Sequence, residues 1–181
     1  MASYEEKNYG GSLRHDTSSP PQSLWVGVRS MSKATYPGLL DQMVAGGLSS
    51  GSSLRENVER ECVEEASVQR TLADCVVPAG MISYRYSTRK GLSTKLLYVY
   101  DLELPHDFVP YNGDGEVDEF KFYSVEEAIE TVKQSLHLWK PNSALVMVDF
   151  AVRHGFLQPD MPEYAQICHL LRSGFASNEF M

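Results

Sequence analysis

Glu61, Glu64 and Glu65 are crowded into little more than one turn of a predicted helix. Residues three and four positions apart lie side by side on a helix, so Glu61 and its two neighbours repel one another. Carboxylate oxygens are hard ligands that suit Mg²⁺ or Mn²⁺, and these cations usually bind a few carboxylates together with substrate phosphates. The spacing therefore predicts a divalent-cation site that acts on a phosphate compound.

The helix that carries these glutamates is predicted over residues 54–66. Ser53, followed by Glu56 three positions later, forms a capping box that starts it. An apolar stripe follows one face at helical spacing, made of Leu54, Val58, Cys62 and Ala66. Glu65 falls between two members of this stripe, so we expect its carboxylate at the desolvated margin of the core. The alternative is a solvated, salt-bridged helix, because Arg60 lies four positions from both Glu56 and Glu64.

A glycine-containing loop precedes the helix. Gly46, Gly47 and Gly51 allow the backbone to turn sharply and to approach a ligand closely. No Gly-Lys-Ser/Thr follows, which excludes a Walker A loop, and the glycine spacing does not fit a dinucleotide fingerprint. We therefore expect a loop–helix unit that holds metal ions against a diphosphate, with Gly46 and Gly47 in contact with substrate.

The composition limits the partners. The chain has 181 residues and a formal net charge of −8, which argues against nucleic acid as a partner. No apolar run approaches the roughly 18 residues that would span a bilayer, so a membrane is excluded as well. Three widely spaced cysteines indicate reduced thiols, and the N-terminal residues lack the pattern of a signal or transit peptide. These observations predict a cytoplasmic protein and leave its oligomeric state open.

The order of the elements predicts one α/β (α+β) domain over residues 24–181, preceded by a flexible N-terminal arm over residues 1–23 that is rich in Gly, Ser and Pro. Strands are expected at residues 24–29, 39–47, 76–87, 93–104 and 118–124. Further helices are expected at residues 125–136, 141–155 and 162–174.

The segment from Gly46 to Val68 resembles the Nudix box. The residues that fall on the consensus spacing are Gly46, Arg60, Glu61, Cys62, Glu64, Glu65 and Val68. Ser52 replaces the first consensus Glu, and Ser67 replaces the terminal Gly, where it must close the helix at positive φ at a cost of about 1 kcal/mol. Residues 24–170 are also similar to a eukaryotic Nudix subgroup described as related to thiamin pyrophosphokinase.

The resemblance implies a Nudix-type α/β/α sandwich with a mixed β-sheet and a metal-dependent pyrophosphohydrolase. Its substrate would be a diphosphate linked to an organic moiety, with thiamin diphosphate or an analogue as the candidate, and a monophosphate would be released. Glu61, Glu64 and Glu65 would bind Mg²⁺ or Mn²⁺. Arg60 would be a further catalytic residue, and because the usual partner of this Arg is missing, Glu56 is a possible substitute.

The general base is either one of the box glutamates or an acid from elsewhere. Glu116 is the candidate for the outside acid, against the alternative that it caps a surface turn. Arg29 and Lys33 are candidates for phosphate binding, and Tyr84 and Tyr86 for stacking on a heteroaromatic ring, against surface charge and ordinary strand aromatics.

Two other functions stay open. The loss of the box Glu at Ser52 suits a Nudix-fold module that binds a diphosphate ligand without hydrolysing it. The acidic surface suits a structural adaptor that would not be stabilised by Mg²⁺ together with a diphosphate.

Overall fold

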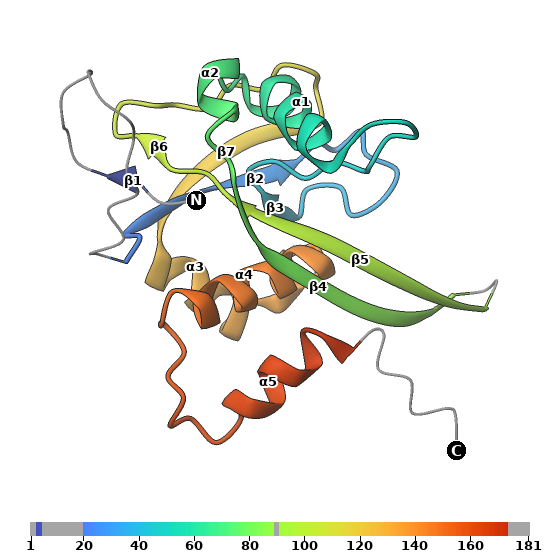
Figure 1. The fold of residues 1–181 in the computed structure, drawn as a ribbon, viewed down its shortest axis with the longest axis vertical. Helices are drawn as coiled ribbons and strands as arrows, with labels where there is room; N and C mark the ends of the chain where they lie inside the picture. The colour runs from blue at the N-terminus through green and yellow to red at the C-terminus, as the bar shows by residue number, and fades with distance from the viewer. Residues whose placement is uncertain (1–2, 5–19, 89–90, 174–181) are drawn as a thin grey trace.

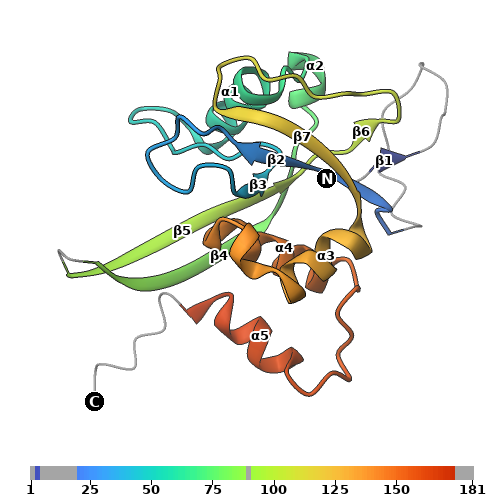
Figure 2. The same cartoon turned by 180° about the vertical axis from the view of Figure 1, so that it is seen from behind.

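The computed structural model describes residues 3–4, 20–88 and 91–173. Helices cover both sides of a layer of strands, with α1 and α2 on one side and α3, α4 and α5 on the other (Figures 1 and 2). The helices are α1 (Leu54–Ala66), α2 (Arg70–Ala73), α3 (Val125–Gln134), the 3₁₀ helix η1 (Leu136–Leu138), α4 (Pro141–Arg153) and α5 (Tyr164–Leu170). The strands are β1 (Ser3–Tyr4), β2 (Ser23–Arg29), β3 (Leu40–Gln42), β4 (Val77–Thr88), β5 (Gly91–Asp101), β6 (Leu104–Pro105) and β7 (Val117–Ser124). This arrangement confirms the predicted α/β/α fold.

The strands pair in both senses. β2 lies between β3 and β7 and is antiparallel to both, so that Val26 faces Gln42 on one side and Lys121 on the other. β4 and β5 form a long antiparallel hairpin that extends beyond the helices (Figure 1). β1 and β6 pair in parallel, as does the single bridge between Leu40 and Trp139.

Separate apolar clusters fill the space between the layers. The first lies between the three-stranded sheet and α3 and α4, and includes Leu24, Val26, Val125, Trp139 and Phe150. The second lies beneath α1 and α2, and includes Met43, Cys62, Ala66, Val68 and Leu102. Because Cys62 and Ala66 are buried in the second cluster, the apolar stripe of α1 fixes which side of that helix faces the strands.

Local signals predicted most of the elements. α1 has the expected bounds, and the capping box of Ser53 and Glu56 is present. α5 is shorter than the predicted helix at residues 162–174, whose last residue lies outside the described part. α2 was not predicted, because four residues are too few to show a periodicity.

The predicted arm at residues 1–23 lies largely outside the described residues. Of its described residues, Ser3 and Tyr4 pair with β6, and Ser23 begins β2. Within residues 3–4, 20–88 and 91–173, no helix has the length and apolar character needed to cross a bilayer.

Candidate active site

α1 presents its three glutamates in three different environments. Glu65 is buried, with 5 % of its surface exposed, and its carboxylate accepts a hydrogen bond of 2.8 Å from the backbone N–H of Ala45. Glu61 is partly buried, and Glu64, on the outer flank, is about half exposed. The predicted position of Glu65 at the margin of the core is confirmed, because α1 is anchored by the buried residues on either side of it.

The glycine loop lies directly over Glu61. A Cβ atom at Gly46 would stand 2.1 Å from the carboxylate carbon of Glu61, so any side chain at this position would displace the Glu61 carboxylate. A Cβ atom at Gly47 would meet nothing within 4 Å. Of the two predicted substrate-contacting glycines, Gly46 therefore packs on a candidate metal ligand, and Gly47 lies in open space.

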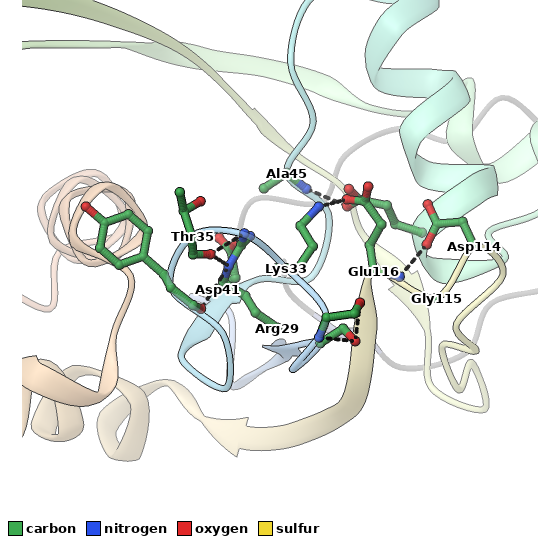
Figure 3. Close-up of polar contacts among 12 residues, drawn as sticks. Arg29, Lys33, Thr35, Asp41, Ala45, Asp114, Gly115 and Glu116 are labelled. Carbon is green, nitrogen blue, oxygen red and sulfur yellow. Dashed lines mark hydrogen bonds and ion pairs between the residues drawn. The ribbon is translucent and has the colours of Figure 1, made fainter.

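A second loop, residues 106–116, brings two more carboxylate side chains close to Glu61 and Glu65. It docks on the C-terminal end of α1, where the N–H of Tyr111 donates to the carbonyl of Ala66 at 3.3 Å. Gly113 passes so close that a Cβ atom would lie 2.4 Å from the carbonyl oxygen of Glu64. The loop ends with Asp114 and Glu116, and the backbone N–H of Glu116 donates a hydrogen bond to the Asp114 carboxylate (Figure 3).

Glu61, Glu65, Asp114 and Glu116 together form what we call the carboxylate cluster. The pKa of Glu65 is raised to about 7, mainly by burial and also by the charges of Glu61, Glu116 and Asp114, against the Ala45 N–H, which lowers it. Burial also raises the pKa of Glu61, while Arg60 lowers it. A buried carboxylate beside three others is the electrostatic environment that a bound cation would relieve.

A small cavity opens between Glu65 and Glu116. Its volume is about 10 Å³, which is room for one water-sized species, and its lining also includes Gly27, Arg29, Asp41, Gln42, Ala45 and Val117. The organic part of a substrate is too large for it and would have to bind outside its mouth.

Arg60 is held by Glu61 and by two residues that the sequence did not mark for this role, Ser49 and Asn57. Its guanidinium donates to Asn57 Oδ1 at 2.8 Å, to Ser49 Oγ at 3.0 Å and to Glu61 Oε1 at 2.9 Å. Glu56, the predicted substitute partner, is instead engaged in the capping box with Ser53. That prediction is wrong, because helix capping takes the Glu56 carboxylate toward the N-terminus of α1.

Arg29 and Lys33, the two predicted phosphate-binding residues, have different partners. Arg29 is buried, and its guanidinium donates to Asp41 at 2.7 Å and to the carbonyls of Thr35 and Tyr36 (Figure 3). Arg29 therefore secures loop 30–38 and is not available to a phosphate in this arrangement. Lys33, on that loop, forms an ion pair with Glu116.

Asp41 connects this loop to α4. Besides Arg29, its carboxylate accepts a hydrogen bond of 2.8 Å from Lys140 Nζ and one from the Ser143 hydroxyl, both at the start of α4. No local pattern marked Asp41 for this role, because it lies within a strand of three residues.

Tyr84 and Tyr86 lie on the β4–β5 hairpin, on one face of β4. Their rings are stacked, with centroids 5.9 Å apart. Burial raises the pKa of Tyr84, and the phenol groups of Tyr86 and Tyr36 add to the effect. Tyr36 itself has a positive φ of 54°, a strained conformation for an aromatic residue.

Carboxylates suit Mg²⁺ or Mn²⁺ in chemistry, and two members of the cluster, Glu65 and Glu116, line a cavity with room for one water-sized species. In the described part of the chain, however, no three His, Cys, Asp or Glu side chains already converge in the arrangement of a metal site. The carboxylates have other partners: Glu61 pairs with Arg60, Glu65 accepts from the Ala45 N–H, and Glu116 pairs with Lys33. Metal binding would require some of these partners to be exchanged.

Comparison with known proteins identifies the family. The sequence profile described as NUDIX domain matches residues 17–144. Nudix hydrolase 24, chloroplastic, of Arabidopsis thaliana is 44% identical over 154 residues, which are 85% of this chain and 42% of that protein. Nudix hydrolase 20, chloroplastic, of the same plant is 44% identical over 150 residues, 83% of this chain and 40% of that protein. The chain thus spans less than half the length of these relatives.

A solved structure shows the same fold. The crystal structure of DR0079 from Deinococcus radiodurans superimposes with a TM-score of 0.53 at 22% sequence identity, and the match covers 78% of this chain and 91% of that one. The loop–helix unit with its glutamates, the fold and the profile match agree, and the chain belongs to the Nudix family.

Proposed function

We propose that this protein is a metal-dependent pyrophosphohydrolase that cleaves a diphosphate linked to an organic moiety and releases a monophosphate. The observation that carries the proposal is the burial of Glu65 beside Glu61, Asp114 and Glu116, with a cavity of ionic size between Glu65 and Glu116. The names of the two plant relatives, which are Nudix hydrolases, support it.

In this proposal each of the candidate residues has a separate role. Glu61, Glu64 and Glu65 hold Mg²⁺ or Mn²⁺, and Arg60 keeps Glu61 in place through the hydrogen bond already present. When bound there, a divalent cation would supply neutralisation of the diphosphate oxygens and a lowered pKa for the attacking water. Glu116, which lines the cavity, would accept the proton of that water as general base.

Thiamin diphosphate, or an analogue with an altered ring, is the proposed substrate. The stacked pair Tyr84 and Tyr86, close to Tyr36, provides aromatic faces for a planar heterocycle outside the small cavity. A nucleoside diphosphate sugar is the competing substrate class, and a substrate screen separates the two.

The non-hydrolysing binding module is less well supported. Its motivation was Ser52 in place of the box Glu, but Ser49 and Asn57 hold Arg60 next to Glu61 in spite of that change. The proposed enzyme therefore retains the local arrangement that the missing Glu would have stabilised.

The test is a hydrolysis screen. The purified protein is incubated with thiamin diphosphate, its oxidised analogues and nucleoside diphosphate sugars, with Mg²⁺, Mn²⁺ or a chelator, and the released phosphate or monophosphate is measured. We expect metal-dependent turnover that Glu65→Gln lowers by about 100- to 1,000-fold. The matched control is Glu59→Gln, on the same helix but paired with Arg55 and Arg70. Absence of turnover with every compound, or equal rates for the two variants, would contradict the proposal.

The cytoplasmic location is proposed from the sequence alone. Because the two plant relatives are named chloroplastic, imaging of a fluorescent fusion in the native cells is the direct test.

A further inference from the structure

The carboxylate cluster contacts two positively charged side chains, each on a different carboxylate. Arg60 binds Glu61 at 2.9 Å, and Lys33 binds Glu116. Glu65 and Asp114 accept backbone N–H groups, which carry no full charge. When all four carboxylates are ionised, these six groups have a formal excess of two negative charges.

The two cations differ in how firmly they are held. Arg60 donates to three acceptors at once, whereas Lys33 is a point charge on a flexible stem whose ammonium reaches across from loop 30–38 (Figure 3). The side chains of Lys33 and Glu116 are 25% and 46% exposed, and ion pairs this exposed contribute little to stability. The Lys33–Glu116 pair is therefore the one that can be exchanged most readily.

The backbone that carries Lys33 is fixed on the same strand end. The N–H of Ser30 donates to the carbonyl of Glu116 at 2.9 Å, and the N–H of Met31 donates to Asp118 Oδ2 at 2.9 Å. Arg29 holds the far side of the loop through the carbonyls of Thr35 and Tyr36. Exchange of partners at Lys33 thus requires rotation of one side chain and no opening of the loop.

We propose that Lys33 is a placeholder cation that alternates between Glu116 and the substrate. In the metal-free protein its ammonium neutralises Glu116; when Glu61, Glu64 and Glu65 hold a divalent cation near Glu116, Lys33 leaves Glu116 and binds a phosphate oxygen of the diphosphate. This inference rests on the proposed function and adds the order of binding: the metal ion binds before the substrate. It follows from the position of Lys33, which pairs with the cluster carboxylate Glu116 from outside the set of residues that line the cavity.

If Lys33 exchanges partners in this way, Lys33→Gln should change two binding affinities in opposite directions. Removal of the competing ammonium should tighten the binding of Mn²⁺ alone about threefold. The same change should weaken binding of imidodiphosphate, a non-hydrolysable diphosphate, to the Mn²⁺-saturated protein about tenfold, because a charge-assisted phosphate contact is lost. Both constants are measured by titration calorimetry. Because loss of a nearby positive charge by itself favours a cation and disfavours an anion, the exchange is identified by whether the change in Mn²⁺ affinity depends on Glu116.

The controls use the same protein. Lys33→Arg keeps the charge and should restore imidodiphosphate binding, and Lys121→Gln, which removes a lysine paired with Glu119 on β7, should change neither constant. In a Glu116→Gln background, Lys33→Gln should no longer tighten Mn²⁺ binding. Weaker or unchanged Mn²⁺ binding by Lys33→Gln, or unchanged imidodiphosphate binding, overturns the inference. Because neither titration requires turnover, failure of the hydrolysis screen is recognised separately.

Discussion

The backbone of Gly46 lies against the carboxylate of Glu61 with no room for a methyl group between them. Gly46→Ala should therefore push Glu61 out of position, and displacement of a catalytic group by about 1 Å can lower the rate about 100-fold. Gly47→Ala is the matched control, since a Cβ atom there meets nothing within 4 Å. Steady-state kinetics and Mn²⁺ titration of both variants provide the measurement. Similar losses in the two variants would mean that the contact has no catalytic importance.

The pH dependence of stability tests the burial of Glu65. Its pKa is raised to about 7 in the folded protein, from 4.5 for an unperturbed glutamate, so the folded state binds the proton more tightly than the unfolded state. The resulting stabilisation is complete below about pH 4.5 and is lost as the pH rises to 7. In the presence of a chelator, we expect a loss of about 2–3 kcal/mol in the free energy of unfolding over this range.

Glu65→Gln should remove this part of the pH dependence and should be more stable than the parent protein at pH 8. Urea unfolding of both proteins at pH 5 and pH 8 measures the difference. Parallel pH profiles for the two proteins would show that the Glu65 carboxylate is ionised without penalty.

Asn57 is predicted to be essential to the position of Arg60. Its Oδ1 accepts hydrogen bonds from Arg60 Nη2 and from the N–H of Ser49, and the residue is buried. Asn57→Ala leaves these donors without their acceptor and should lower the free energy of unfolding by about 1–3 kcal/mol and reduce turnover. Asn57→Asp, which keeps an acceptor oxygen, should retain more of both. Denaturation and kinetics that rank the two variants in the reverse order would exclude this role.

Ser67 ends α1 with φ of 52°, in the left-handed region. Ser67→Gly should relieve this strain and stabilise the protein by about 0.5–1 kcal/mol, with no change in the metal dependence of hydrolysis. The midpoint and slope of urea unfolding measure the gain. A destabilised variant would indicate that the Ser67 side chain makes a contact worth more than the strain.

The sequence predicted the features that depend on neighbouring residues. The Ser53–Glu56 box and the spacing of the apolar stripe gave the bounds of α1, and the position of Glu65 within that stripe gave its burial. The left-handed conformation at Ser67 followed in the same way from the helix end. Each of these depends on interactions within one or two helical turns, which sequence spacing encodes directly.

Contacts between distant segments could not be predicted. The partners Lys33 and Glu116 are 83 positions apart, and Arg29 could be recognised as a loop anchor only after Asp41 and the carbonyls of loop 30–38 were placed around it. Asn57 gave no signal, because an asparagine in an acidic helix has no spacing rule of its own. The proximity of Glu116 to Glu65 arises from the docking of loop 106–116 on α1, which is tertiary packing.

The position of loop 30–38 depends, through Asp41, on a helix of the opposite layer. Through Arg29 it fixes the loop, and through Lys140 and Ser143 it is fixed by the beginning of α4. Substitutions at the beginning of α4 will therefore change the position of loop 30–38 without altering any residue of that loop. Chimaeras that graft this loop onto a related scaffold need the matching end of α4 as well.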